Sequence, residues 1–148
     1  MNVYVNDVYI PYLNDETRTQ IFYGGSSSGK SFFLAQRTVK DVLQGHNYLI
    51  VRNVAGTVKR SVYNQILKTI GDFGLKDEFI ISKSEMVITC VQNDKQILFG
   101  GLDDPEKLKS VTPINGVITD IWIEEATESA YEAYKQLTKR LRGESGNI

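Results

Sequence analysis

The sequence predicts an α/β fold, with a parallel sheet covered by helices and an antiparallel β insertion in its middle. Three observations predict this architecture. Apolar runs of strand length alternate with amphipathic helical patterns over most of the 148 residues, which is typical of parallel sheets flanked by helices. A glycine-rich loop joins the first of these runs to the first helical pattern. Three later apolar runs are separated only by short turns, which favours antiparallel pairing.

Composition excludes several classes of protein. The formal net charge is −1, so contact with nucleic acid would require a local basic patch. The single cysteine, Cys90, excludes an intramolecular disulfide, and we expect it in the core of a protein from a reducing compartment. The sequence has neither a charged leader with an apolar run nor a window of about 18 apolar residues. We therefore expect a cytoplasmic protein with no membrane partner.

The N-terminal region is expected to form short strands before the first helix. Residues 1–19 carry alternating apolar side chains with Asn6-Asp7 as a turn, which predicts a strand or hairpin arm. Gln20–Tyr23 predicts a short buried strand. Apolar residues at helical spacing predict a helix from Phe32 to Leu43, and Gly45 is a suitable stop.

Three ring side chains in this region have more than one possible role. Tyr9 and Tyr12 precede the glycine-rich loop, where they either pack in the core or stack on a nucleotide base. His46 is the only histidine and follows the helix stop. We expect it in the turn or on the surface, because a single histidine does not make a metal site.

The middle of the chain predicts a strand, a helix and two hairpins. Tyr48–Val51 is a compact apolar strand. From Val58 to Phe73, apolar residues recur every three or four positions, which marks an amphipathic helix. Turn residues separate the next three apolar runs, which predict two consecutive hairpins: Phe79–Ile81, Met86–Val91 and Gln96–Phe99.

The C-terminal third predicts a short helix, a strand and a last helix. Pro105 suits the first turn of a short helical segment. Val117–Ile123 predicts a further strand that runs into two glutamates. The final amphipathic pattern predicts a helix from about Glu128 to Leu141.

The glycine-rich loop matches the phosphate-binding pattern G-x-x-x-x-G-K-[ST] at every fixed position. Its glycines allow tight turns close to a ligand, and the loop and helix N–H groups suit an anion. Lys30 would contact the β- and γ-phosphates, and the Ser31 hydroxyl would ligate Mg²⁺. The pattern therefore predicts a site for ATP or GTP. The predicted nucleotide-binding residues are Gly24, Gly25, Ser26, Ser27, Ser28, Gly29, Lys30, Ser31 and Phe32.

Two adjacent acids follow the strand that ends at Ile123. Acids at the carboxyl end of a buried parallel strand emerge where ligands bind in open α/β sheets. We expect Glu124 to serve the Mg²⁺ shell opposite Ser31, and Glu125 to polarise the attacking water. The alternative is that both glutamates only open the next helix, where its dipole favours acids. Asp120 is a weaker candidate for the metal acid, because three apolar residues would then lie past the sheet edge.

Four segments resemble, in order, the N-terminal part of the large terminase subunits of tailed bacteriophages, in particular the prophage-type branch. They are the loop Tyr23–Ser31, the segment Gly100–Lys109, the acidic strand end Ile121–Glu128 and the helical segment Leu137–Gly143. The loop alone is shared by very many NTPases, so the other three segments carry the specificity.

The resemblance implies an ATPase of the additional-strand class of P-loop folds, in which another strand separates the acidic strand from the loop strand. It implies a motor that drives double-stranded viral DNA into the capsid in the host cytoplasm. The implied partners are the portal protein, a small terminase subunit and further copies in a ring. Lys30 and Ser31 match the phosphate and Mg²⁺ contacts, Glu124 the metal acid and Glu125 the catalytic glutamate. The catalytic pair is therefore Glu125 with Lys30, and the cofactors are ATP and Mg²⁺.

The chain departs from the family pattern at three points. Many members have an arginine in the loop where this chain has Ser26, and many have aspartate where Glu124 stands. Residues 1–148 match only the first part of the ATPase domain, and the family's coupling motif and nuclease domain would follow. Arg140 and Arg142 are candidates for charge stabilisation at a subunit contact. The alternatives are another P-loop motor of helicase or RecA type, and a fragment that binds nucleotide without turnover.

Overall fold

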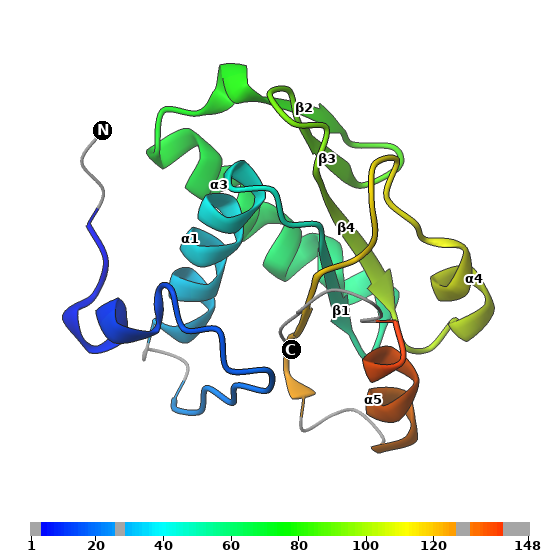
Figure 1. Cartoon of the computed structure of the whole chain (residues 1–148). Helices are drawn as coiled ribbons and strands as arrows, with labels where there is room; N and C mark the ends of the chain where they lie inside the picture. Colours follow the sequence, from blue (N-terminus) through cyan, green and yellow to red (C-terminus); the bar gives the residue numbers. More distant parts are fainter. Residues whose placement is uncertain (1–3, 26–28, 127–130, 141–148) are drawn as a thin grey trace.

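The computed structural model describes residues 4–25, 29–126 and 131–140. Its centre is a five-stranded mixed sheet with strand order β2-β3-β4-β1-β5 (Figure 1). β1 (Tyr48–Arg52) pairs in parallel with β4 (Gln96–Gly101) on one side and β5 (Asp120–Ile123) on the other. The parallel part of the sheet predicted from the sequence is confirmed.

The antiparallel insertion is also confirmed. β2 (Phe79–Ser82) pairs with β3 (Val87–Cys90), and β3 pairs with β4, both antiparallel. The two connecting turns each contain a residue with positive φ, Met86 at 53° and Asp94 at 60°. Cys90 is fully buried on β3, as expected.

Helices cover both faces of the sheet (Figure 1). α1 (Lys30–Leu43) and α3 (Asn64–Asp72) pack on one face, and α4 (Pro105–Ser110) and α5 (Tyr131–Thr138) lie on the other. Side chains of β1 alternate between the two faces, since Tyr48 and Ile50 contact the first helices while Leu49 and Val51 contact the second. Leu49, Ile50 and Val51 are fully buried, and each contributes about 1.5–3 kcal/mol relative to exposure. No helix in the described part of the chain has the length and apolar character needed to cross a membrane.

The predicted helix from Val58 to Phe73 is present but not regular. It begins as α2 (Ala55–Val58), passes through a π-helical turn at Lys59–Tyr63 and continues as α3. Two short 3₁₀ helices, η1 (Asp7–Tyr12) and η3 (Lys76–Glu78), complete the described elements. Of the predicted last helix, Glu128 and Leu141 lie outside the described residues.

The strand or hairpin arm predicted for residues 1–19 is wrong for residues 4–19, and residues 1–3 lie outside the described residues. The Asn6 side chain instead accepts a hydrogen bond from the Val8 N–H at 3.4 Å and caps η1. An asparagine at this position satisfies a free helical N–H, so it favours a helix start over a hairpin turn. Tyr9, inside η1, is buried.

The strand predicted at Gln20–Tyr23 is wrong as well. The segment has no strand partner, and Ile21 and Tyr23 are 81% and 90% exposed. Its Gln20 amide bonds the carbonyls of Asp15 and Thr17 instead. A strand needs a hydrogen-bonded neighbour, and among the described residues β5 pairs only with β1.

β5 is shorter than the predicted Val117–Ile123. The fully buried Asn47 explains where it begins, because its amide donates to the carbonyls of Asn115 and Val117 at 2.7 and 3.0 Å. These bonds hold the approach to β5 in an irregular conformation, and the ladder with β1 starts at Asp120.

Candidate nucleotide and metal site

The phosphate-loop pattern lies at the N-terminus of α1. Gly29 is the residue before the helix and has φ 78°, a left-handed conformation that glycine adopts without steric cost. Its carbonyl accepts the first helical hydrogen bond, from the Phe33 N–H at 2.9 Å. Gly24 and Gly25 are exposed, and Ser26, Ser27 and Ser28 lie outside the described residues. As in any α-helix, the N–H groups in the first turn of α1 have no partner within the helix, and they lie at the end of the loop.

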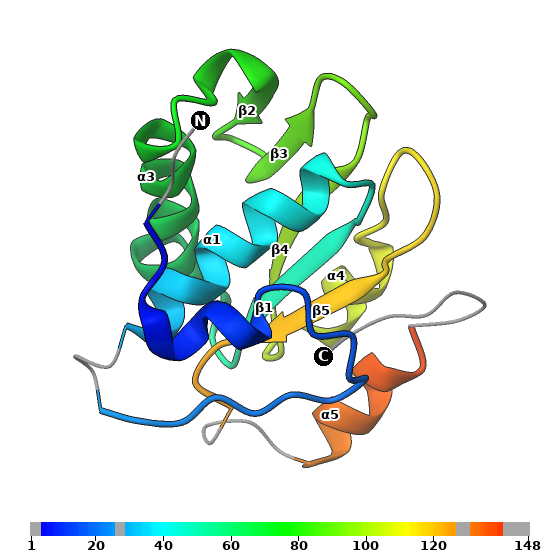
Figure 2. The same cartoon turned by 60° about the vertical axis from the view of Figure 1, so that its left-hand side comes forward.

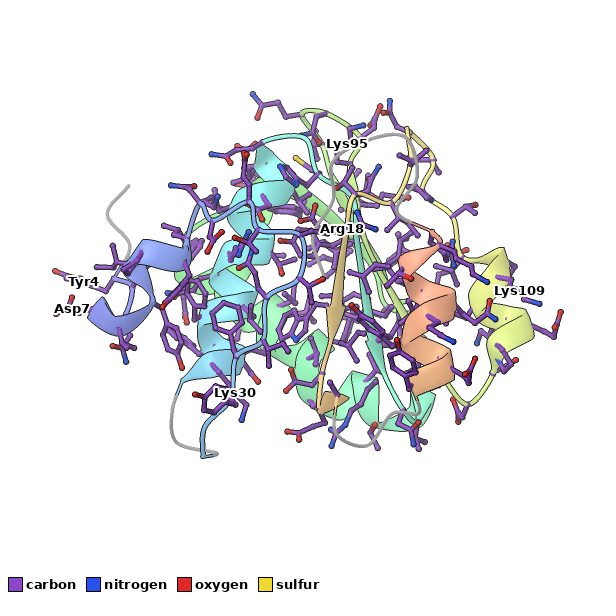
Figure 3. The ribbon with its side chains drawn as sticks, turned by 60° about the horizontal axis from the view of Figure 1, so that its bottom comes forward. Tyr4, Asp7, Arg18, Lys30, Lys95 and Lys109 are labelled. Carbon is purple, nitrogen blue, oxygen red and sulfur yellow. The ribbon has the colours of Figure 1, made fainter. Side chains whose placement is uncertain are left out.

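Lys30 closes the two ends of the loop. Its ammonium donates to the Gly24 carbonyl at 2.8 Å, across six positions of sequence. Figure 3 shows Lys30 at the start of α1, at the same end of the molecule as the arrowhead of β5. Phe32, the next residue but one, is 41% exposed in the first turn.

Ser31 and Glu124 meet although 93 positions separate them. The Ser31 hydroxyl donates to Glu124 Oε1 at 2.7 Å. The Glu124 N–H donates to the Val51 carbonyl at 2.9 Å, so the first acid continues the β1–β5 pairing by one bond. Glu124 is 9% exposed. The structure thus brings the loop hydroxyl and the first acid of the strand end to one point.

Trp122 also holds Glu124, which the sequence analysis missed. Its indole N–H donates to Glu124 Oε2 at 2.9 Å. Glu124 directly follows β5 and continues its pairing with β1 by one bond, so the spacing of two positions leaves the side chains of Trp122 and Glu124 on the same face. The only sequence signal was this spacing of a tryptophan and an acid.

Glu125 differs from its neighbour. It is exposed and has φ 53°, the left-handed region that a non-glycine residue seldom occupies. Such a conformation costs energy and recurs at functional sites. Glu125 lies one residue beyond Glu124, at the carboxyl end of β5.

An aromatic cluster packs next to the loop, between the segment before it and the first turn of α1. Tyr9 stacks on Phe33 with ring centroids 4.7 Å apart and an angle of 7°, and Phe22 packs against both rings. Tyr12 meets Phe22 edge-on at 5.7 Å. Tyr9 and Tyr12 are therefore packing residues in this structure. The cluster anchors the segment just before Gly24 to the first turn of the site helix.

Arg37 is a second anchor that the sequence analysis missed. It is buried on α1, and its guanidinium donates to Gln20 Oε1 at 2.7 Å and to the Asp15 carbonyl at 2.5 Å. The same side chain pairs with Asp41 at 3.4 Å. The N-terminal segment consequently wraps around the loop end of α1 (Figure 2). These bonds set where the chain enters the loop.

Asp120 is not at this site. It begins β5 at the opposite end from Glu124, about 13 Å away for a four-residue rise. There its carboxylate lies 2.6 Å from His46 Nδ1. This hydrogen bond raises the pKa of His46 above its ordinary value, although partial burial opposes the rise. His46 is thus a partner of a buried acid and not merely a turn residue.

The ligand atoms of Asp41, His46 and Asp120 lie within 4.8 Å of one another, but their charges are already compensated. Asp41 accepts from the Tyr48 hydroxyl at 2.5 Å and pairs with Lys40 at 2.6 Å. A divalent cation would have to displace the Lys40 ammonium. The group is better described as a network of hydrogen bonds and ion pairs that connects the end of α1 to the start of β5.

Arg140 has a structural role within the described residues. Its guanidinium donates to the carbonyls of Leu108 and Val111 at 2.7 and 2.5 Å, which satisfies the C-terminal end of α4. Burial lowers its pKa from the ordinary value. Arg142 lies outside the described residues.

Comparison with known proteins identifies the family. The family described as "Phage terminase large subunit" matches residues 16–148. The chain is 35% identical over 130 residues to the "PBSX phage terminase large subunit" of Bacillus subtilis strain 168, covering 87% of this chain. It is 29% identical over 109 residues to the large terminase subunit of Bacillus phage SPP1, covering 73% of this chain.

The fold agrees with this relationship. The large terminase of a thermophilic bacteriophage superposes with a TM-score of 0.67 over 84% of this chain, at 13% identity. That terminase has also been solved in complex with ADP and with ATP-γ-S. The chain spans 29% and 26% of the two Bacillus relatives and 31% of the thermophilic phage terminase chain. The helicase and RecA alternatives are thereby set aside.

Proposed function

This chain belongs to the phage terminase large subunit family, and we propose that it holds the ATP of a motor that translocates viral DNA into a capsid. The observation that carries the proposal is the 2.7 Å hydrogen bond between Ser31 and Glu124. It joins a phosphate-loop pattern to an acidic strand end in one site. The ADP and ATP-γ-S complexes of the thermophilic phage terminase support ATP as the nucleotide.

The donor atoms of the site fit Mg²⁺. Ser31 supplies a hydroxyl oxygen and Glu124 a carboxylate oxygen, which are hard ligands of the kind that Mg²⁺ prefers. Both lie beside the N-terminus of α1, where the helix dipole and free N–H groups favour phosphate. When bound, the metal would neutralise charge on the β- and γ-phosphates.

The other roles follow from position. The loop from Gly24 to Phe32 would surround the phosphates with N–H groups, and Lys30 would add a point charge. The Lys30 side chain is held at the loop by its hydrogen bond to the Gly24 carbonyl. Glu125 is exposed at the end of β5 and would accept a hydrogen bond from the attacking water. ATP hydrolysis is therefore the proposed reaction.

The partners are those of a packaging machine. We assign to the full-length subunit the binding of double-stranded DNA, the portal protein and a small terminase subunit, with several copies in a ring. The basis is membership of the family, because the chain itself has a net charge of −1. Any contact with DNA must come from a local patch or from another part of the subunit.

Binding of a fluorescent ADP analogue to the 148-residue chain tests the proposal. The native chain should bind it, and Lys30→Ala should abolish binding, because the phosphates lose their charged partner. Lys83→Ala is the matched control, since Lys83 is an exposed lysine in the β2–β3 turn. Equal binding by the Lys30 and Lys83 variants would contradict the site. Binding without ATP turnover would assign hydrolysis to the full-length subunit only.

A further inference from the structure

Trp122 is buried beside the proposed metal acid and makes a polar contact that packing alone does not need. The side chain is 6% exposed and contributes to the core between the sheet and α1. Its indole N–H nevertheless donates a hydrogen bond to Glu124 Oε2, at 2.9 Å. It is the only tryptophan in the chain.

Both oxygens of the Glu124 carboxylate are therefore engaged. Ser31 on α1 donates to Oε1, and Trp122 on β5 donates to Oε2. Two donors from two different elements fix both the position and the rotation of the carboxylate. An ionised carboxylate can accept about four hydrogen bonds, so each oxygen keeps a lone pair for a metal or its water.

We propose that Trp122 is a positioning residue for the metal site: its indole N–H orients Glu124 and thereby determines how much Mg²⁺ strengthens nucleotide binding. The inference rests on the proposed function of this site. Groups that hold a metal ligand by hydrogen bonds commonly change metal affinity by about 10–100-fold when removed. A tryptophan that only fills the core would have no effect on metal dependence.

The test measures the affinity of a fluorescent ADP analogue twice, with Mg²⁺ and with EDTA, for the 148-residue chain. The ratio of the two affinities reports the metal contribution alone. Trp122→Phe keeps an aromatic ring and removes the N–H. We expect the ratio to fall about tenfold while the affinity in EDTA stays unchanged.

Tyr63→Phe is the matched control. Tyr63 lies in the same core cluster, is 2% exposed, and its hydroxyl has no hydrogen-bond partner among the described residues. This variant should leave the ratio unchanged. A folded Trp122→Phe variant with the native ratio would overturn the proposal. Failure of the native chain to bind nucleotide would instead overturn the proposed function.

A double variant tests whether Trp122 acts through Glu124. Glu124→Gln should lower the ratio by itself, and adding Trp122→Phe should lower it no further. If the two substitutions instead lowered the affinity ratio independently, so that their effects multiplied, the proposal that Trp122 acts through Glu124 would be overturned.

The native chain offers a readout that does not depend on the folding of Trp122→Phe. Its single tryptophan should change emission when Mg²⁺ is added to the ADP complex, and Glu124→Gln should remove that change. An emission unaffected by Mg²⁺, under conditions where Mg²⁺ strengthens ADP binding, would overturn the proposal.

Discussion

Ser31 donates a hydrogen bond to Glu124 across the interface between the first helix and the edge strand, at 2.7 Å. This bond holds the two oxygens proposed as Mg²⁺ ligands close together, and each of them keeps a lone pair for the metal or its water. Because protein contacts position these ligand oxygens, less ordering of side chains is left to metal binding.

Ser31→Ala should therefore separate nucleotide binding from metal binding. The affinity for an ADP analogue in EDTA should persist, while the gain from Mg²⁺ should fall by about tenfold or more because a ligand oxygen is lost. Titrations with and without Mg²⁺ measure both quantities. Ser110→Ala, which removes an exposed hydroxyl at the end of α4, should leave both unchanged.

Glu125→Gln should keep nucleotide binding and stop turnover in the full-length subunit. The amide has the size of the carboxylate but cannot polarise water, so hydrolysis should fall on the order of 10²–10⁴-fold. Phosphate release under single-turnover conditions measures the effect. Glu132→Gln, at an exposed helical acid, is the control. A normal rate of ATP hydrolysis in the Glu125 variant would show that another residue polarises the attacking water.

Glu125→Gly should stabilise the fold and remove the carboxylate that is proposed to polarise the attacking water. The native residue has φ 53°, and glycine adopts this region without the steric cost of a Cβ. Relief of the left-handed conformation should raise the free energy of unfolding by about 1 kcal/mol. Urea unfolding provides the comparison, and a less stable variant would show that the conformation is unstrained.

Arg37→Met should destabilise the fold and loosen the entry to the loop. The change removes two short hydrogen bonds to the N-terminal segment and leaves buried Asp41 with one cation fewer. We expect a loss of about 3 kcal/mol in urea unfolding. Arg18→Met is the control, because Arg18 is exposed. Equal free energies of unfolding for the two variants would show that Arg37 does not anchor the N-terminal segment.

His46 should make stability decrease with rising pH. Its folded pKa is raised above the ordinary 6.5, chiefly by the hydrogen bond to Asp120. The folded state then binds more protons than the unfolded state in this range. The stabilisation is complete below pH 6.5 and is lost as pH rises through the folded pKa.

Urea unfolding at several pH values between about 5 and 9, around the His46 transition, measures this slope. His46→Asn should flatten it, and the interpretation is simple because the chain has one histidine. A variant that keeps the native slope would assign the titration to another group.

Local patterns predicted most of the fold. The two hairpins, the central strand and the helices α1 and α3 were found from apolar periodicity and turn residues, which act over a few neighbouring positions. The expected strand at Gln20–Tyr23 was wrong because a strand also requires a neighbouring strand as a hydrogen-bonding partner. The sequence of the segment does not indicate whether such a partner is present. The start of β5 was misplaced because the Asn47 side chain is bonded to the preceding segment.

By itself, the sequence determined that this protein carries a phosphate-binding loop before a helix and an acid pair after an apolar strand. Each pattern is a run of adjacent residues whose chemistry needs no distant partner to be recognised. Only the tertiary structure decided that Ser31 meets Glu124, that Trp122 holds the other carboxylate oxygen and that Asp120 pairs with His46 at the far end. These three contacts depend on how β5 is aligned against α1 and β1. That alignment is set by packing and hydrogen bonds between elements far apart in the chain.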